Sequence, residues 1–455
     1  MKLSEIITTL REIRVSPVRS LGQNFLHDQN LARWIVEQAD VSAQDFVVEI
    51  GPGLGALTEI ILAKGAGVFA IEKDERLVKF LREKFVDERV EIAHEDALEF
   101  DLRSLFTKPR VKLFGNLPYY ISSQLLVRFL EYPSPISLWV LMLQKELARR
   151  LSAAPGTRDY GALTLQIQSR YRVEYLRTIP ASVFLPKPDV DSAVVRIVPR
   201  VRGDLSACNQ KVFEHIVRRG FSQRRKQLGN LIRKEVPAWE AVASELHLNP
   251  RARAEELSLE QWIELTNRIA PVAPASNSDL AEEQFQIVDE RDRPTGAAPR
   301  GQVHANNFLH RAVHILIFNS SGEVFLQLRS PLKDRHPLTW DSSVAGHVNA
   351  GEEYGQTANR ELREELGIET ALTKIAKLSA SKQTDQEFVC LYHGFYDGEL
   401  WPNPAEIEAG KFFPPPVVDE WTKARPQEFA PGFVECWKVS RGKKRLTPVM
   451  PTSRT

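Results

Sequence analysis

Five short apolar runs alternate with stretches of helical periodicity in the first half of the sequence, and this alternation constrains the fold more than any other feature. The runs are FVVEI (46–50), VFAIE (68–72), VEIAHED (90–96), VKLFGN (111–116) and LWVLMLQ (138–144). Apolar strands separated by amphipathic helices are typical of a parallel sheet with crossover helices. We therefore predict an α/β fold with a Rossmann-like sheet for this half.

The first run continues into a glycine-rich segment, EIGPGLGALT (49–58). Glycines at this point let a nucleotide-like ligand approach the backbone at a helix N-terminus. Glu72 lies 21 residues after Gly51, at the end of the next run, where a carboxylate can accept both ribose hydroxyls. The glycine pattern alone does not separate NAD from S-adenosylmethionine.

Two further polar residues follow later runs. Asp96 closes the third run, where it can hold an adenine amine, and Asn116 ends the fourth and begins NLPYY. Each acid taken alone is equally well explained as a helix cap or a surface carboxylate. Because the carboxyl ends of consecutive parallel strands meet at one edge of the sheet, the combination indicates a cofactor site there.

The NLPYY segment has a chemical interpretation. An adenine amine is a poor nucleophile because its lone pair is delocalised into the ring, and acceptors for both N–H bonds favour the pyramidal, nucleophilic form. We predict that Asn116 Oδ1 and the Leu117 carbonyl are these acceptors, that Pro118 fixes the backbone, and that Tyr119 stacks on the base. Methyl transfer then requires alignment with the sulfonium, once the base has been unstacked.

Charge is distributed unevenly along the chain, although the net charge is only +1. Residues 187–234 carry 12 Lys or Arg against 4 Asp or Glu. This density suits phosphate contacts, and a solvated helix face is the alternative. The candidate RNA-binding residues are Arg218, Arg219, Arg224, Arg225 and Lys226.

Residues 15–268 resemble the small-subunit ribosomal RNA adenine dimethyltransferases (the KsgA/RsmA family). The matching segments are GQNFLHD (22–28), VEIGPGLGALT (48–58), IEKD (71–74), EDAL (95–98), GNLPYYIS (115–122), LMLQKE (141–146), FLPKPDVDSAVVR (184–196) and FSQRRKQLGNLI (221–232). The resemblance implies that S-adenosylmethionine is the cofactor and that Phe184 is a second stacking face. Implied cofactor contacts come from Asn24, Leu26, Gly51, Glu72, Asp96 and Asn116.

The same resemblance implies a substrate. The family dimethylates two adjacent adenosines in a hairpin loop near the 3′ end of small-subunit rRNA, within an assembling subunit, and the basic block would then contact phosphates. Tyr120 departs from the family pattern, in which a smaller polar residue often follows NLPY. Two alternatives stay open: methylation of large-subunit rRNA, as in the related resistance methyltransferases, and an assembly factor with a silent second half.

The second half contains GHVNAGEEYGQTANRELREELGI (346–368), which fits the Nudix box G-x5-E-x7-R-E-U-x-E-E-x-G-U (U apolar) at every fixed position. Glu361, Glu364 and Glu365 stand on one face of the implied helix. Carboxylates clustered so closely indicate Mg²⁺ or Mn²⁺ together with a diphosphate. We expect Glu352 and Arg360 to pair and brace the loop rather than to do chemistry.

The region around the box resembles the isopentenyl-diphosphate-isomerase-like Nudix proteins. TWDSSVAGHV (339–348) has no cysteine where the true isomerases place a catalytic one. We therefore predict hydrolysis of a nucleoside diphosphate or another diphosphate-linked small molecule rather than isomerisation. The predicted second fold is an α/β/α Nudix domain.

The expected organisation is a Rossmann-like methyltransferase domain followed by a small helical subdomain and the Nudix domain. The three scattered cysteines form no C-x-x-C pair, and the sequence has no apolar run of 18 residues. These features predict a cytoplasmic protein without a membrane partner. We expect it to be a monomer. The predicted boundaries are 1–200 for the methyltransferase domain, 201–269 for the helical RNA-binding subdomain, 270–281 for a linker, 282–441 for the Nudix domain and 442–455 for a basic tail.

Overall fold

The computed structural model describes the chain except for residues 18–22, 87–88, 202–203, 273–282 and 443–455. It divides into two compact units, Met1–Pro271 and Val272–Thr455. Residues 273–281 of the predicted linker and 443–455 of the predicted basic tail lie outside the described residues. Each unit has its own sheet and its own core.

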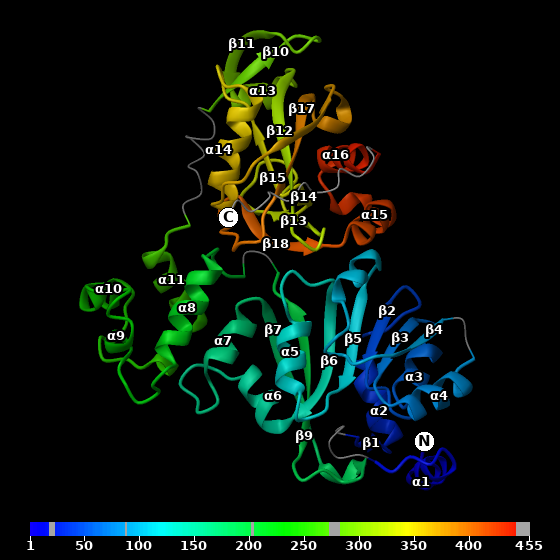
Figure 1. Ribbon diagram of the computed structural model, residues 1–455. Coiled ribbons are helices and arrows are strands. Elements are labelled where there is room, and N and C mark those ends of the chain that lie inside the picture. The colour runs from blue at the N-terminus through cyan, green and yellow to red at the C-terminus, as the bar shows by residue number, and fades with distance from the viewer. Residues whose placement is uncertain (18–22, 87–88, 202–203, 273–282, 443–455) are drawn as a thin grey trace, which may run out of the picture. The chain divides into compact units, whose positions relative to one another are not determined.

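The first unit is built on a seven-stranded sheet of order β4-β3-β2-β5-β6-β9-β7 (Figure 1). The first five strands are parallel, whereas β9 pairs antiparallel with both of its neighbours, β6 and β7, at one end of the sheet. This confirms the predicted Rossmann-like parallel sheet. The strands are β2 (Phe46–Ile50), β3 (Gly67–Glu72), β4 (Val90–His94), β5 (Val111–Asn116), β6 (Ile136–Gln144), β7 (Tyr171–Ile179) and β9 (Ser192–Pro199).

Helices cover both faces of this sheet. Successive strand residues point to opposite faces, so Val47 and Val48, both fully buried, belong to two different core clusters. One cluster joins the sheet to α2 (Gln29–Glu37), α3 (Thr58–Ala63) and α4 (Glu75–Lys84). The other joins it to α5 (Ser122–Phe129), α6 (Lys145–Leu151) and α7 (Ala162–Gln168).

Smaller elements complete the first unit. Helix α1 (Leu3–Glu12) precedes β1 (Phe25–Leu26), which pairs antiparallel with β8 (Phe184–Leu185). A helical segment around the fully buried Trp262 has a separate core. Its helices are α8 (Gln210–Gly220), α9 (Leu228–Leu231), α10 (Trp239–Glu245) and α11 (Leu259–Ile269).

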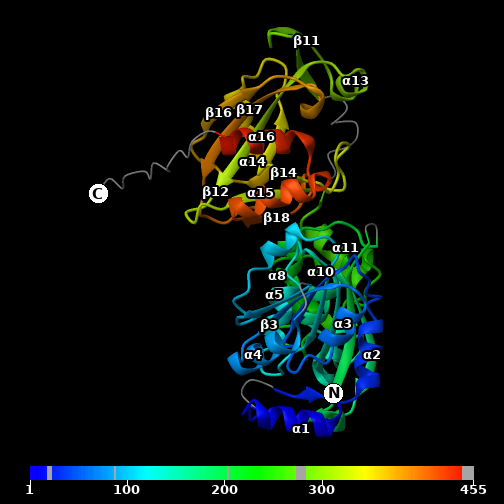
Figure 2. The same ribbon diagram turned by 90° about the vertical axis from the view of Figure 1, so that its right-hand side faces the viewer.

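The second unit is a mixed nine-stranded sheet between helices. Val313, Ile315 and Ile317 of β12 (His310–Phe318) share a core with α14 (Tyr354–Leu366), whereas His314 lies next to Gly432 of α16 (Pro431–Gly442). Figures 1 and 2 show α14 on one side of the sheet and α15 (Pro415–Ala424) with α16 on the other. The predicted α/β/α arrangement is therefore confirmed.

The strands and the remaining helix of this unit are β10 (Gln284–Val288), β11 (Pro294–Pro299), α13 (Arg300–Asn306), β12 (His310–Phe318), β13 (Val324–Arg329), β14 (Trp340–Asp341), β15 (Val344–His347), β16 (Thr373–Leu378), β17 (Glu387–Phe395) and β18 (Ile407–Phe413). Strand β12 pairs parallel with β17 and antiparallel with β15. These pairings bring the start of the Nudix box, on β15, next to the centre of the sheet. In the described part of the chain, no helix is both long enough and apolar enough to cross a membrane.

Gly410 on β18 tests the packing of this sheet. A Cβ at position 410 would overlap the ring of Phe325, whereas a Cβ at Gly301, on α13 of the same unit, would meet open space. We expect Gly410→Ala to lower the free energy of unfolding of the second unit by about 1–3 kcal/mol through overpacking. Urea unfolding of Gly410→Ala beside Gly301→Ala measures this, and equal stabilities would contradict it.

Candidate cofactor and diphosphate sites

Two adjoining cavities open at the carboxyl edge of the first sheet, with volumes of about 90 and 50 Å³. They share five lining residues: Asn24, Phe25, Gly51, Gly53 and Asn116. Every predicted cofactor residue lines at least one of them: Asn24, Leu26, Gly51, Glu72, Asp96 and Asn116. The structure thus brings the six together from five separate segments, and their individual roles stay predictions.

The glycine loop after β2 depends on backbone conformations that suit glycine. Gly51 has φ +64° and Gly53 has φ +59°, in the left-handed region that side chains rarely adopt. A Cβ at Gly53 would also lie 3.2 Å from the ring of Phe25. The loop therefore leaves an open approach to its backbone at the place where the predicted cofactor would lie.

Glu72, the last residue of β3, is buried at 8 % exposure. Burial raises the pKa of its carboxyl, although the backbone amides of Lys73 and Asp74 each donate to its Oε1 at 2.9 Å. These bonds hold the carboxylate at the cavity wall, and its ribose contact stays a prediction.

Asp96 lies two residues beyond the end of β4, not on the strand. Its Oδ2 is 2.6 Å from the ammonium nitrogen of Lys73, and this hydrogen bond lowers the pKa of Asp96. The carboxylate that was predicted to hold an adenine amine is therefore ionised and paired with a cation within the chain.

Glu49 is a site residue that the sequence interpretation missed. It lines the smaller cavity, is 2 % exposed, and accepts a 2.6 Å hydrogen bond from the Thr58 hydroxyl. Burial raises the pKa of Glu49 to about 7. The signal was present in the sequence, because a glutamate inside the apolar run FVVEI has to be buried with a partner.

The NLPYY loop begins at the last residue of β5. The side-chain amide nitrogen of Asn116 donates to the Asn24 carbonyl at 3.0 Å, so its oxygen is the atom left for an incoming donor. The Leu117 amide donates to the Met142 carbonyl at 3.1 Å. The Tyr119 hydroxyl lies 2.6 Å from Ser192 Oγ, and burial raises the pKa of this tyrosine.

The aromatic residues predicted or noted near the base differ in exposure. Phe184 pairs with Leu26 across β8 and β1, is 3 % exposed, and lines neither cavity. Tyr120 is 55 % exposed and lines the larger cavity. The ring of Phe184 packs in the core of the unit. Since it does not line either cavity, its stacking role stays a prediction.

All five predicted RNA-binding residues, at 218–219 and 224–226, are exposed. Two of them also have partners within the unit: Arg219 lies 3.6 Å from Glu235, and Arg224 lies 3.8 Å from Glu255. They form a cationic surface near the end of α8.

In the second unit, the three predicted metal-binding glutamates line one cavity of about 370 Å³. Glu361 and Glu365 are buried, at 8 % and 2 % exposure, whereas the side chain of Glu364 is 55 % exposed. Burial and the neighbouring charge of Glu365 raise the pKa of Glu361 to about 8. Two adjacent buried carboxylates that resist ionisation are a donor set that fits a divalent cation.

Arg360 organises these carboxylates. Its guanidinium bonds Glu352 at 3.0 and 3.1 Å, which confirms the predicted bracing pair. It also donates to Glu361 and Glu364, at 2.9 Å each, and to the carbonyl of His347 at 3.2 Å. One cation thus fixes both the box helix and the strand before it.

The rest of the cavity wall was not predicted. It carries four cationic side chains that can face phosphate oxygens: Arg300, Arg329, Lys333 and Arg335. It also carries His304 and His347, which cluster with His310. These residues come from α13, β12, β13, β15 and the loop after β13, so no local spacing in the sequence links them.

The first unit therefore belongs to a definable class: a Rossmann-like methyltransferase sheet with a glycine loop, an acidic residue on the next strand and an asparagine beginning NLPY. Residues 17–271 match the family described as "Ribosomal RNA adenine dimethylase", and residues 308–433 match the "NUDIX domain". The chain belongs to the ribosomal RNA adenine dimethylase family and carries a Nudix hydrolase domain after it.

Curated relatives resemble the first unit over most of their length. A protein of Halothermothrix orenii named "Ribosomal RNA small subunit methyltransferase A" is 40 % identical over 272 residues, which cover 57 % of this chain and 90 % of that protein. One of the same name from Prosthecochloris aestuarii is 42 % identical over 262 residues, covering 58 % of this chain and 97 % of that protein.

Solved structures with partial similarity to the chain include two proteins. The crystal structure of the 23S rRNA methyltransferase ErmE is 26 % identical, covers 54 % of this chain and 99 % of that chain, and has a TM-score of 0.47. A Deinococcus radiodurans protein is 29 % identical, covers 35 % of this chain and 98 % of that chain, and has a TM-score of 0.31.

Gly346 provides a test of the carboxylate site. A Cβ at this position would overlap the carboxyl group of Glu361, whereas a Cβ at Gly355, on the box helix, would meet open space. We expect Gly346→Ala to displace Glu361 and to weaken Mn²⁺ binding by about 10-fold or more. Isothermal titration of both variants with Mn²⁺ measures this. An unchanged affinity in Gly346→Ala would contradict the predicted role of Glu361 as a metal ligand.

Proposed function

We propose that the first unit transfers methyl groups from S-adenosylmethionine to N6 of two adjacent adenosines in the 3′-terminal hairpin loop of small-subunit rRNA. The observation that carries this proposal is the position of Asn116, at the edge of the cofactor cavities with its amide nitrogen already bonded to Asn24. The similarity to proteins named as small-subunit methyltransferases supports the small subunit rather than the large subunit as the target.

The chain's own residues would act by positioning. Asn116 Oδ1 and the Leu117 carbonyl accept the two N–H bonds of the target adenine, which localises the lone pair on nitrogen. Pro118 restricts the backbone between these acceptors and Tyr119, whose ring offers a stacking face held by Ser192. S-adenosylmethionine supplies the methyl group, and alignment of the amine with the sulfonium is the remaining requirement.

Binding of the cofactor would use the two adjoining cavities. Gly51 allows close approach to the backbone, Glu72 accepts the ribose hydroxyls and Asp96 accepts the adenine amine, while Asn24 and Leu26 complete the wall. The exposed basic residues at 218–226 would contact RNA phosphates. We also propose that the methyltransferase domain ends at residue 200, the helical subdomain at 269, the linker at 281 and the Nudix domain at 441.

For the second unit, we propose hydrolysis of a diphosphate-linked small molecule. Glu361, Glu364 and Glu365 would hold Mg²⁺ or Mn²⁺, which polarises phosphoryl oxygens and activates water. The cationic side chains of the same cavity, Arg329 and Lys333 among them, would bind the phosphates. Lys333 also pairs with Glu406, which favours its charged form, whereas burial lowers the pKa of its ammonium group.

Asn116→Ala tests the methyltransferase proposal. Loss of one acceptor should lower the rate of methyl transfer about 10²–10³-fold, while binding of S-adenosylmethionine and of RNA persists. The assay uses labelled cofactor with small ribosomal subunits from cells lacking this modification, and the labelled nucleotide is mapped. Asn30→Ala, an exposed change on α2, is the control.

Three results would contradict this proposal in different ways. Full activity in Asn116→Ala would remove the acceptor role. Label on large subunits instead of small ones would move the function to large-subunit rRNA. No label on either would favour a binding factor for the immature subunit.

Glu364→Gln tests the hydrolase proposal. Removing one carboxylate charge from the metal site should reduce metal-dependent cleavage at least about 100-fold. Release of phosphate or nucleotide from a panel of nucleoside diphosphate conjugates, with Mg²⁺ or Mn²⁺, measures the rate. Glu369→Gln is the control because Glu369 is exposed and lies outside the cavity. An unchanged rate in Glu364→Gln would overturn the metal assignment.

A further inference from the structure

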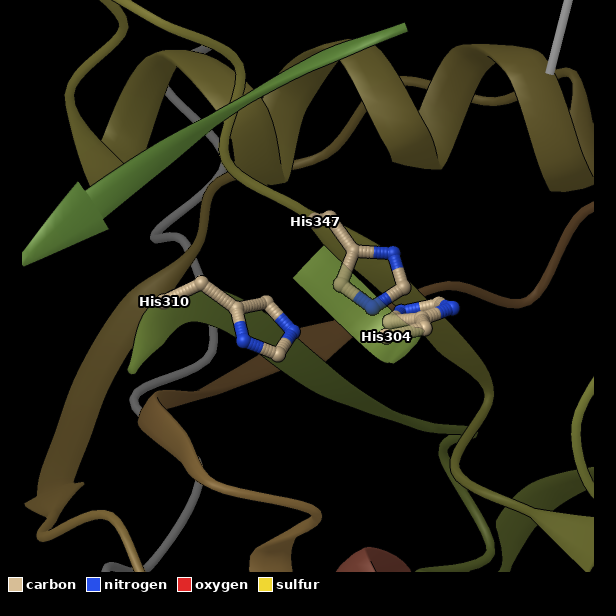
Figure 3. A group of neighbouring side chains, drawn as sticks. All are labelled: His304, His310 and His347. Atoms are coloured by element: carbon tan, nitrogen blue, oxygen red, sulfur yellow. The ribbon is translucent and has the colours of Figure 1, made fainter. Parts of the chain in front are cut away.

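The cavity of the box glutamates also contains His314, a residue of β12 that the proposed hydrolysis does not use. It is separate from His304, His310 and His347, whose imidazoles form the cluster in Figure 3. The imidazole of His314 is almost fully buried, with 6 % of its side chain exposed. Because the ring nitrogens of a buried imidazole need hydrogen-bond partners, the contacts of each nitrogen decide its role.

Hydrogen bonds fix the orientation of this ring through one of its nitrogens. His314 Nδ1 lies 2.7 Å from Ser342 Oγ, and Ser342 is fully buried. Asp341 holds the same segment, since its Oδ1 accepts from the Ser342 amide at 2.7 Å and its Oδ2 accepts from Arg329 at 2.8 Å. These bonds connect the imidazole to Arg329, one of the cationic residues of the cavity wall.

The other ring nitrogen, Nε2, lies among small residues. Within the part of the chain that the structure describes, no group donates to His314 Nε2 or accepts from it. A Cβ at Gly432 would lie 3.4 Å from Nε2, so the glycine leaves this side of the ring uncovered. Ala345 is paired with His314 across β12 and β15, and Ala312 precedes it by two residues on the same face of the strand. These small residues leave room for a ligand atom at Nε2.

The composition of the cavity wall disfavours two kinds of ligand. Among the described residues, its only apolar side chains are those of Ala312, Ala345 and Ala430, and it includes no phenylalanine, tyrosine, tryptophan, leucine, isoleucine or valine. Nucleobases stack on aromatic faces, and isoprenyl chains bury their surface against large apolar side chains. The volume of about 370 Å³ is near the lower end of the range for small-molecule sites. The wall therefore suits a compact polar ligand better than a nucleoside or an isoprenoid.

His314 adds a chemical requirement to this polar ligand. An apolar chain placed at Nε2 would bury the nitrogen without a partner, which costs free energy. A hydroxyl group avoids this cost, because it donates to an unprotonated Nε2 and accepts from a protonated one. It therefore serves the ring in either tautomer that the bond to Ser342 allows. A hydroxyl is the ligand group that best fits the space beside His314.

We propose that the diphosphate bound in this cavity carries a small hydroxylated carbon skeleton, of the sugar or polyol class, and that His314 Nε2 recognises one of its hydroxyls. The inference rests on the proposed hydrolysis, because it names the group attached to the diphosphate in the same cavity. The cationic side chains bind the phosphates, and Arg329 connects them to His314 through Asp341 and Ser342. His314 is thus a specificity-determining residue that takes no part in the cleavage.

A purely structural role for His314 explains fewer of these contacts. The bond to Ser342 occupies Nδ1 alone and does not account for the small residues around Nε2. His393 provides a comparison, because its Nε2 lies 3.0 Å from Ser440 Oγ and it is not part of the cavity wall. It is therefore the matched control for a histidine that is held by a serine hydroxyl.

The test compares two diphosphates with five-carbon groups, ribose 5-diphosphate and isopentenyl diphosphate, and adds UDP as a nucleoside diphosphate. Calorimetric titration of the full-length chain with their non-hydrolysable methylene analogues, in the presence of Mg²⁺, gives the affinities. We expect the ribose analogue to bind at least about 100-fold more tightly than the isopentenyl analogue. His314→Leu should weaken binding of the ribose analogue at least about 10-fold but not that of the isopentenyl analogue. His314→Gln, which keeps a hydrogen-bonding group, should restore most of the lost affinity.

Two results in the unaltered chain would overturn the ligand class, and neither depends on the folding of a variant. These are equal affinities for the ribose and isopentenyl analogues, and tightest binding of the UDP analogue. Equal affinities for the ribose analogue in His314→Leu and His393→Leu, with both folded by circular dichroism, would overturn the role of His314. A failure of the hydrolase proposal looks different: the unaltered chain would bind the ribose analogue selectively, which supports the ligand class, and would release no phosphate from ribose 5-diphosphate with Mg²⁺ or Mn²⁺.

Discussion

The first unit depends on one geometric constraint, which is that parallel strands of a sheet all end at the same edge. Strands β2, β3 and β5 lie side by side, so Gly51, Glu72 and Asn116 meet although up to 65 residues separate them in the sequence. Hydrogen bonds then fix the details: the Gly51 amide donates to the Ile71 carbonyl at 2.9 Å. A methyl-transfer site that works by positioning needs this rigidity more than it needs an acid or a base.

The second unit depends on a different constraint, the burial of like charges. Glu361 and Glu365 are held close together away from water, an arrangement that is unfavourable unless cations compensate it. Arg360 supplies part of this compensation from the same helix, and Lys333 adds another positive charge from the loop after β13. The negative charge that these cations leave uncompensated supports the proposal that the cavity binds a metal ion.

The sequence predicted those parts of the structure that local patterns determine. The five apolar runs became β2 to β6 with ends shifted by no more than two residues, and the Nudix box specified its helix because the spacing of its glutamates is a helical spacing. The histidine cluster and the cationic wall could not be predicted, because α13, β12 and β15 meet only through the pairing of the sheet. Phe184 shows a similar limit, since its pairing with Leu26 places the ring in the core.

The ion pair between Lys73 and Asp96 has a consequence for how a ligand enters the first site. If Asp96 accepts the adenine amine, the ligand does not fill a vacant acceptor but exchanges with an ammonium group that already occupies it. Both side chains are partly exposed, so the displaced lysine can return to water at little cost. A ligand whose amine donates only a weak hydrogen bond would not displace Lys73 from Asp96. Competition between Lys73 and the ligand for Asp96 would therefore contribute to selectivity for adenine.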